Sequence, residues 1–220
     1  GRHSRALNYQ YAVVYDAMRS PNVQRRMRSD VSRPEWQGDR LDDAIGLSVI
    51  SGSLDIHQRL VNDRMETTGE TLWWYGGSGR PSEDPASLPV LFFDKWSQNA
   101  DGGMPVYTTF AGSTDWNIAD SLRVVRFDDK KLPVATVRMK AYRRGQQDIE
   151  LLNMLAALPG FNRWHVARLV GEWVPTNKTL QRTNPDDPGS FKYEGVDESR
   201  LQHVRERVIA TILKHKGNEQ

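Results

Sequence analysis

The residues of this chain whose types suggest chemistry are aromatic and acidic side chains that follow apolar segments. Trp73, Trp74 and Tyr75 stand in a row, and the adjacent acids Glu83 and Asp84 come after a glycine-rich stretch. If residues 71–75 form a strand, successive side chains point to opposite faces. Trp73 and Tyr75 then share one face and Trp74 takes the other. Such rings either line a binding surface or pack in a core.

Other kinds of site find little support in the sequence. The chain has no cysteine, which excludes thiolate ligands, disulfides and a cysteine nucleophile. Residues 76–80 (Gly-Gly-Ser-Gly-Arg) match neither the nucleophile elbow of a hydrolase nor a phosphate-binding loop. We therefore expect no metal and no cofactor. The histidines are scattered singly, without a second ligand at helical spacing: His3, His57, His165, His203 and His215.

Composition excludes several classes of partner. Thirty Lys and Arg against 28 Asp and Glu give a formal net charge of only +2, so we expect no nucleic-acid partner. The longest apolar stretches, such as residues 88–93, are far shorter than the ~20 residues of a membrane span. The N-terminus lacks the apolar stretch of a secretory signal, which a processed or truncated chain would have lost. The cellular compartment stays open.

The elements that must position the aromatic residues alternate between strand and helix. Apolar or β-branched runs predict strands at 44–50, 71–75 and 106–110, and a helical pattern follows each of them. The predicted helices cover 53–69, 91–100 and 132–158, and a leading helix covers 6–18. Such alternation indicates parallel strands covered by helices, as in doubly wound sheets and (β/α) barrels. Three such units cannot close a barrel.

The character of the sequence changes near residue 160. A short helix is predicted at 164–173, a polar segment rich in Pro, Asp and Asn at 176–195, and a final amphipathic helix at 196–214. We therefore divide the chain into residues 1–160, which hold the strand and helix units, and residues 161–220, which form a helical extension.

Residues 136–152 (Thr-Val-Arg-Met-Lys-Ala-Tyr-Arg-Arg-Gly-Gln-Gln-Asp-Ile-Glu-Leu-Leu) resemble a helix signature of glycoside hydrolase family 123 and its relatives. That signature typically reads Ser-Ile-Arg-Leu-Glu-x-Leu-Arg-Asp-Gly-Ile-Glu-Asp-Tyr-Glu-Tyr-Leu. Residues 69–75 and Trp96 resemble the strand and helix that precede it in that family, so the resemblance covers 69–158. The positions that match the signature are Arg138, Arg143, Gly145, Asp148, Glu150 and Leu152.

The resemblance implies a fold and an activity. The fold would be α/β, the C-terminal half of a (β/α)8 TIM-type barrel with an added C-terminal helical segment. Characterised members are β-N-acetylgalactosaminidases that use substrate assistance, with an adjacent Asp-Glu pair as acid and positioning carboxylate. By this mapping the pair would precede Gly1, so no catalytic acid is expected in this chain. The chain departs from the family at 103–107 and 127–129, near the expected sugar site, so its sugar can differ.

The resemblance also suggests which residues contact the glycan. Tyr75 at the C-terminal end of its strand would reach the site, Trp73 or Trp74 would line it, and Asp115 would hold sugar hydroxyls beside a stacking Trp116. The alternatives are that all three residues at 73–75, and likewise Tyr107, are core, and that Asp115 caps a loop. The substrate-binding candidates are Trp73, Trp74, Tyr75, Tyr107, Asp115 and Trp116.

Several charged residues have a structural alternative. Glu83 and Asp84 are a local substitute for the acid pair, but their order is reversed, and Asp84 before Pro85 is typical of a turn. The charged residues of the 136–152 signature are spaced for ion pairs that fix the long helix to the barrel.

The sequence therefore supports two hypotheses of different functional class. The first is part of a glycoside hydrolase whose other barrel half, lost or supplied as a separate chain, brings the acid pair. The second is a non-catalytic carbohydrate-binding or structural module that covers its strand edges by dimerisation or docking. A weaker hypothesis is a basic-patch interaction protein using Arg25, Arg26, Arg28 and the C-terminal arginines, but these lack interleaved aromatic residues.

Overall fold

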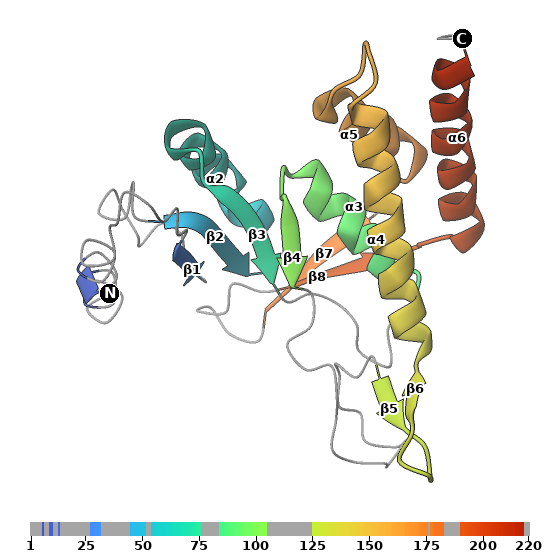
Figure 1. Cartoon of the computed structure of the whole chain (residues 1–220), viewed down its shortest axis with the longest axis horizontal. Coiled ribbons are helices and arrows are strands. Elements are labelled where there is room, and N and C mark those ends of the chain that lie inside the picture. The colour runs from blue at the N-terminus through green and yellow to red at the C-terminus, as the bar shows by residue number, and fades with distance from the viewer. Residues whose placement is uncertain are drawn as a thin grey trace. The chain divides into compact units, whose positions relative to one another are not determined.

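The computed structural model describes residues 6, 9–10, 13, 27–31, 45–51, 54–75, 84–104, 125–175, 177–182 and 190–217. These form an α/β fold that divides into two compact units (Figure 1). Among the described residues, the first unit includes a parallel sheet and the helix over residues 54–68. The described part of the second unit holds four helices, an antiparallel strand pair, and nearly all of another two-stranded sheet. The mixed α/β class expected from the sequence is confirmed.

The sheet of the first unit consists of β1 (Met27–Val31), β2 (Ile45–Ser51), β3 (Thr71–Tyr75) and β4 (Gly102–Met104). Its strands lie in the order β1-β2-β3-β4, and every neighbouring pair is parallel. In this register Val49 lies beside Trp73, and Trp73 lies beside Gly102. The strand order follows the chain order without reversal.

Helix α2 (Leu54–Thr68) connects β2 to β3. Its apolar stripe buries Leu54 and Val61, which are at most 3% exposed. The chain leaves the helix through Gly69, whose φ of 68° is the left-handed conformation that glycine adopts at least cost. The predicted helix over 53–69, its glycine C-cap and the strand over 71–75 are confirmed.

The second unit is built around α4 (Val137–Ala156), which packs against α3 (Ser87–Ser97), α5 (Arg163–Trp173) and α6 (Glu198–Gly217). Leu152 and Leu155 of α4 are at most 1% exposed. Removing such apolar area from water is the main source of stability for a helical layer. Further core residues are Leu88, Leu91, Trp96, Val166, Val170, Leu201, Val204, Val208 and Ile212.

Two pairs of short strands complete the second unit. β5 (Val125–Phe127) pairs antiparallel with β6 (Pro133–Ala135), and β7 (Asn177–Gln181) pairs with β8 (Ser190–Glu194). The turn after β5 is fixed by Asp128, whose carboxylate accepts hydrogen bonds from the backbone N–H groups of Lys130 and Leu132 at 2.9 and 2.8 Å. This is the usual way in which an aspartate side chain stabilises a turn.

The long helix starts later than the sequence suggests. Pro133 was expected in its first turn but lies in β6, and the helix begins at Val137. Thr136 sets this start, because its side-chain oxygen accepts a hydrogen bond from the N–H of Met139 at 3.3 Å. The helix was expected to begin at residue 132. That boundary is wrong, because the Thr136 cap starts the helix at Val137.

Other boundaries differ for equally local reasons. α3 begins at Ser87 rather than 91, with Pro89 in its first turn, where a missing N–H costs nothing. Gly102 and Gly103, expected only to end a helix, belong to strand β4. β1, β7 and β8 were not predicted from the sequence. The predicted strand at 106–110 and most of the predicted helix at 6–18 lie outside the described residues.

Candidate functional site

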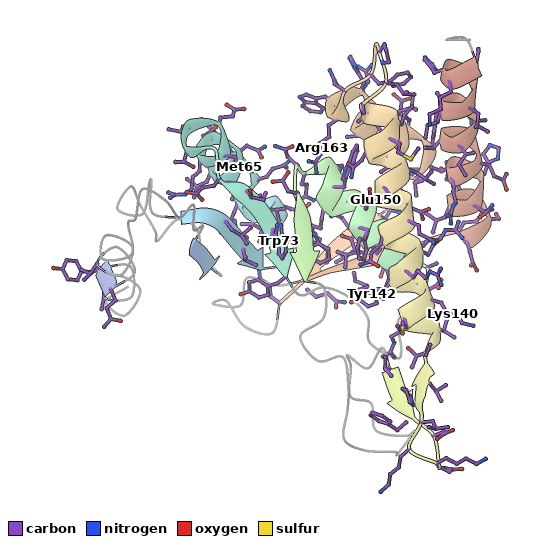
Figure 2. All side chains as sticks on the ribbon, viewed as in Figure 1. Met65, Trp73, Lys140, Tyr142, Glu150 and Arg163 are labelled. Carbon is purple, nitrogen blue, oxygen red and sulfur yellow. The ribbon has the colours of Figure 1, made fainter. Side chains whose placement is uncertain are left out.

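The three consecutive aromatic residues lie on β3 and divide between its two faces. Trp74 is 3% exposed and shares its face with the fully buried Leu72. Trp73 and Tyr75 lie on the opposite face and are half-buried, with Tyr75 at the C-terminal end of the strand. Figure 2 shows Trp73 on the sheet. Trp74 therefore packs in the core. Trp73 and Tyr75 lie on the less buried face of β3.

Both indoles pack against the two glycines of β4. A Cβ atom built on Gly102 would lie 2.7 Å from Nε1, 2.9 Å from Cε2 and 3.1 Å from Cδ1 of Trp73. A Cβ atom on Gly103 would collide with the Trp74 indole in the same way. A large ring on one strand that covers a glycine on the next is a stabilising cross-strand pair. Sequence analysis missed this role of the glycines, which the Trp-Trp and Gly-Gly pairs could have suggested.

The other predicted binding residues are not all described. Tyr107, Asp115, Trp116 and Glu83 lie outside the described residues. Asp84 is described: its carboxylate accepts a hydrogen bond from the N–H of Ala86 at 2.9 Å, and its carbonyl accepts one from Ser87. Asp84 therefore forms the turn that precedes α3, which was the alternative to a catalytic role.

The signature helix α4 uses its matching residues for contact with other helices. At Gly145 an added Cβ would lie 2.8 Å from Cδ2 of Phe92, so the glycine allows α4 to approach α3 closely. Tyr142, one turn earlier, packs edge-on against the same Phe92 ring with centroids 5.9 Å apart. Burial raises the pKa of the Tyr142 hydroxyl far above its ordinary value, an effect that the Arg138 charge opposes. Figure 2 shows Tyr142 and Glu150 along this helix.

Asp148 is the charged centre of the contact between α4 and α6. It is 4% exposed and forms ion pairs with Arg144 on its own helix at 3.2 Å and with Arg205 of α6 at 3.5 Å. Burial raises the pKa of this carboxyl, and the charges of Arg144 and Arg205 act in the opposite direction. Of the charged signature residues expected to form ion pairs, Asp148 does so, and one of its partners lies on another helix of the same unit.

Trp96, part of the family resemblance, joins three helices of the second unit. Its indole Nε1 donates to Oδ1 of Asn153 on α4 at 2.8 Å. The guanidinium of Arg163, at the start of α5, lies 4.9 Å from the centroid of the Trp96 ring. The same guanidinium donates two hydrogen bonds to the Trp96 carbonyl. Trp96 is 4% exposed and acts as a structural residue.

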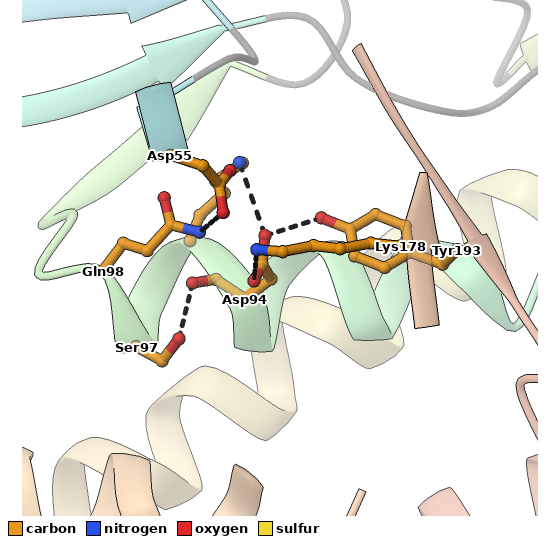
Figure 3. Close-up of polar contacts among 7 residues, drawn as sticks. Asp55, Asp94, Ser97, Gln98, Lys178 and Tyr193 are labelled. Carbon is orange, nitrogen blue, oxygen red and sulfur yellow. Dashed lines mark hydrogen bonds and ion pairs between the residues drawn. The ribbon is translucent and has the colours of Figure 1, made fainter. Parts of the chain in front are cut away.

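A polar cluster that the sequence did not reveal surrounds Asp94 near the end of α3 (Figure 3). Its carboxylate accepts from Lys178 of β7 and from the Tyr193 hydroxyl of β8, both at 2.8 Å, and lies 3.4 Å from the fully buried Lys95. The ring of Phe191 lies 5.5 Å from the Lys95 ammonium group and 5.0 Å from that of Lys178. The Asp94 cluster holds β7 and β8 on α3.

A second buried polar group fixes the start of β3. Glu70 is 4% exposed, accepts a hydrogen bond from Ser48 of β2 at 2.5 Å and pairs with Arg64 of α2 at 2.7 Å. These contacts lie at the N-terminal end of the strand, whereas sites in parallel α/β sheets form at the C-terminal ends. We therefore assign this group to the packing of α2 on the sheet.

The described residues offer no metal centre and no membrane span. Within the described part of the chain, no three His, Asp or Glu side chains are arranged to hold a metal ion. Likewise, no helix in that part is both long and apolar enough to cross a bilayer.

Comparisons with known proteins give matches among solved structures. No family model matches the sequence, and no curated protein matches it. Among solved structures, the chain is similar to a family 123 glycoside hydrolase from Clostridium perfringens, whose study concerns glycolipid glycan hydrolysis. The TM-score is 0.59 at 14% sequence identity, over 93% of this chain and 38% of that protein. The chain thus spans well under half of that protein and is similar in fold to part of it.

Proposed function

We propose that this chain is the C-terminal half of a (β/α)8 barrel that acts on N-acetylhexosaminides or related glycans. In this proposal the chain supplies aromatic residues that bind the sugar, and the catalytic acid pair lies outside it. The missing half of the barrel is either an earlier part of the same polypeptide or a second chain. The division into a half-barrel over 1–160 and an extension over 161–220 stays part of the proposal.

The observation that carries this proposal is the order of the parallel strands together with the burial of β3. Strands that follow one another without reversal are typical of a barrel, whereas a doubly wound sheet reverses its order. Connections between parallel strands are almost always right-handed, so this order puts the connecting helices on one face. The opposite face would be the barrel interior. Trp73 and Tyr75 lie together on one face, and it is the less buried face of β3.

The similarity to part of a family 123 glycoside hydrolase supports a glycan substrate at a distant level. Tyr75 would offer its hydroxyl at the C-terminal end of β3, where barrel enzymes bind their substrates, and Trp73 would provide an apolar surface. The roles of Tyr107, Asp115 and Trp116 stay predictions. A sugar contact for Trp74 also stays a prediction, and its burial favours a core role.

The alternative is a carbohydrate-binding or structural module without catalysis. One observation favours it: Asp84, a member of the local acidic pair, is held in a turn by hydrogen bonds. A binding module needs only the aromatic surface and a partner for the edges of its sheet.

The test begins with the intact mass and the subunit composition of the natural gene product, compared with 25.1 kDa for this chain. The product is then assayed for hydrolysis of an aryl N-acetylhexosaminide and for binding of its methyl glycoside. Turnover by a product that includes more than this chain supports the enzyme, and binding without turnover by a complete protein supports the module. A product of this mass alone that neither binds nor hydrolyses the sugar contradicts both.

Tyr75→Phe and Trp116→Ala should each weaken binding of the methyl glycoside.

A further inference from the structure

The two glycines of β4 place the two indoles of β3 flat on the sheet. For Gly102, the nearest atom of Trp73 is Nε1, and the two ring carbons bonded to it are at most 0.4 Å farther away (3.1 − 2.7 Å). A contact made with the N–H edge of the ring would leave these carbons much farther away than Nε1. The added Cβ would therefore point at the face of the indole, so the ring lies across the neighbouring strand.

This arrangement depends on the register between β3 and β4, and Asp101 fixes that register. Its backbone N–H donates to the carbonyl of Leu72 at 2.7 Å, and its carboxylate accepts from the N–H of Leu72 at 2.9 Å. Trp73 follows Leu72 and Gly102 follows Asp101, and these two residues lie opposite each other in the register of β3 and β4. Asp101 thus aligns each glycine with its own tryptophan.

The two glycine and tryptophan pairs have different surroundings. Trp74, over Gly103, is 3% exposed and belongs to the core. Trp73, over Gly102, is half-buried, on the same face as Tyr75. One ring face of Trp73 rests on the backbone of Gly102, so its other ring face is directed away from the sheet. An indole held in this orientation is an apolar platform with a tyrosine on the same side.

We propose that Gly102 is a positioning residue for sugar binding: having no side chain, it lets Trp73 lie flat, so the outer face of the indole stacks on the C–H face of a pyranose ring. A flat platform selects for such a face, and Tyr75 at the strand end provides a polar partner for a hydroxyl group. This inference rests on the proposed glycan-binding function. A side chain at residue 102 tilts the indole and removes the platform, although it contacts no sugar itself.

The experiment measures the affinity of the complete gene product for the methyl glycosides of N-acetylglucosamine and N-acetylgalactosamine by calorimetry. Gly102→Ala should weaken binding about tenfold, which corresponds to ~1.4 kcal/mol. Gly103→Ala is the matched control, because it displaces the buried Trp74 by the same kind of collision. It should lower the unfolding midpoint and, because Trp74 is 3% exposed, change the affinity of the folded protein far less than Gly102→Ala does.

A double-mutant cycle separates positioning from a general effect on the fold. In a Trp73→Ala background, Gly102→Ala should no longer change the affinity, because it acts only through the indole. If Gly102→Ala alone does not fold, Trp73→Phe is compared with Trp73→Phe/Gly102→Ala: the smaller ring leaves room for the added methyl group, so the two should bind with equal affinity, and a tenfold loss in the double variant overturns the inference. An unchanged affinity in Gly102→Ala, or the same loss in the Trp73→Ala background, overturns the inference. If the unmodified product binds neither glycoside, the proposed function itself fails. This result differs from failure of the Gly102 inference, in which the unmodified product binds but Gly102→Ala does not weaken binding.

Discussion

At the scale of single residues, Asp94 provides the carboxylate for two ammonium groups. Lys95 is fully buried, and Lys178 and the hydroxyl of Tyr193 donate to the same carboxylate. Buried charges interact more strongly than exposed ones, because water screens them less. The Asp94 cluster therefore affects the stability of the second unit far more than an ordinary surface ion pair.

We predict that Asp94→Asn lowers the free energy of unfolding by roughly 1.5–3 kcal/mol, because it removes the charge that accepts hydrogen bonds from Lys178 and from the Tyr193 hydroxyl. The matched control is Glu194→Gln on β8, which removes an exposed ion pair with Lys192 and should change stability by less than about 0.5 kcal/mol. Urea denaturation of the three proteins measures both values. Equal losses in the two variants would contradict the assigned role of the cluster.

Glycines inside two helices should respond in opposite ways to the same substitution. Gly145→Ala in α4 brings a methyl group to within 2.8 Å of Phe92, and such overpacking costs about 1–3 kcal/mol, more than the helix propensity gained. Gly171→Ala in α5 meets nothing within 4 Å and should stabilise by roughly 0.5–1 kcal/mol. Thermal unfolding of both variants tests the pair. If both shift in the same direction, the close approach of α3 and α4 is not as described.

At the scale of elements, α6 depends on two aspartates in contrasting environments. Asp148 of α4 is buried against it, and the pKa of Asp148 is raised by that burial. Asp197, just before α6, accepts hydrogen bonds from the side chain and the N–H of Ser199, which lower its pKa. A carboxylate at a helix N-terminus is stabilised by the free N–H groups there.

These opposite shifts predict opposite effects of pH. A raised pKa means that the folded state holds the proton of Asp148 more tightly than the unfolded chain, so stability falls as the pH rises through the folded pKa. Relative to Asp148→Asn, the wild type should therefore lose stability as the pH rises above the ordinary value of 3.8. Relative to Asp197→Asn, the wild type should gain stability as the pH rises through the lowered pKa towards 3.8. Parallel denaturation series across this pH range measure the two differences, and slopes of the same sign would refute the assignment.

Elements with strong local signals were predictable from the sequence, and those fixed by tertiary contacts were not. Helix α2 and strand β3 followed from an apolar stripe, a glycine C-cap and a β-branched and aromatic run. β4 was missed because Gly102 and Gly103 have low strand propensity and are held there by the tryptophans of β3. β7 and β8 are polar, and their attachment depends on a cluster centred on Asp94, far away in the sequence.

The candidate site was predictable only in part, for the same reason. Alternation along β3 correctly separated Trp73 and Tyr75 from Trp74. The alternation could not say which face is buried, since that depends on what covers the sheet. The Asp94 cluster had no sequence signal because Lys178 and Tyr193 are more than eighty positions away from Asp94 and each residue is ordinary alone. Side chains that meet only through the fold leave no local pattern.

At the scale of the whole molecule, the chain corresponds in fold to 38% of a longer glycoside hydrolase. If the proposed function holds, the 25.1 kDa chain purified alone should show sugar binding without detectable hydrolysis of an aryl N-acetylhexosaminide. Turnover should appear only when the remaining half of the barrel is present, because the acid pair would lie there. Full activity of the isolated chain would mean that the catalytic residues lie within it.

The contact between β3 and β4 also has a consequence for how this sequence can change over evolutionary time. Gly102 and Gly103 each face an indole at a distance that leaves no room for a methyl group. A substitution at either glycine is tolerated only if the ring opposite becomes smaller, and a smaller ring exposes the bare backbone of the glycine. Related sequences should therefore show positions 73 and 102 changing together, and likewise positions 74 and 103, as two independently covarying pairs.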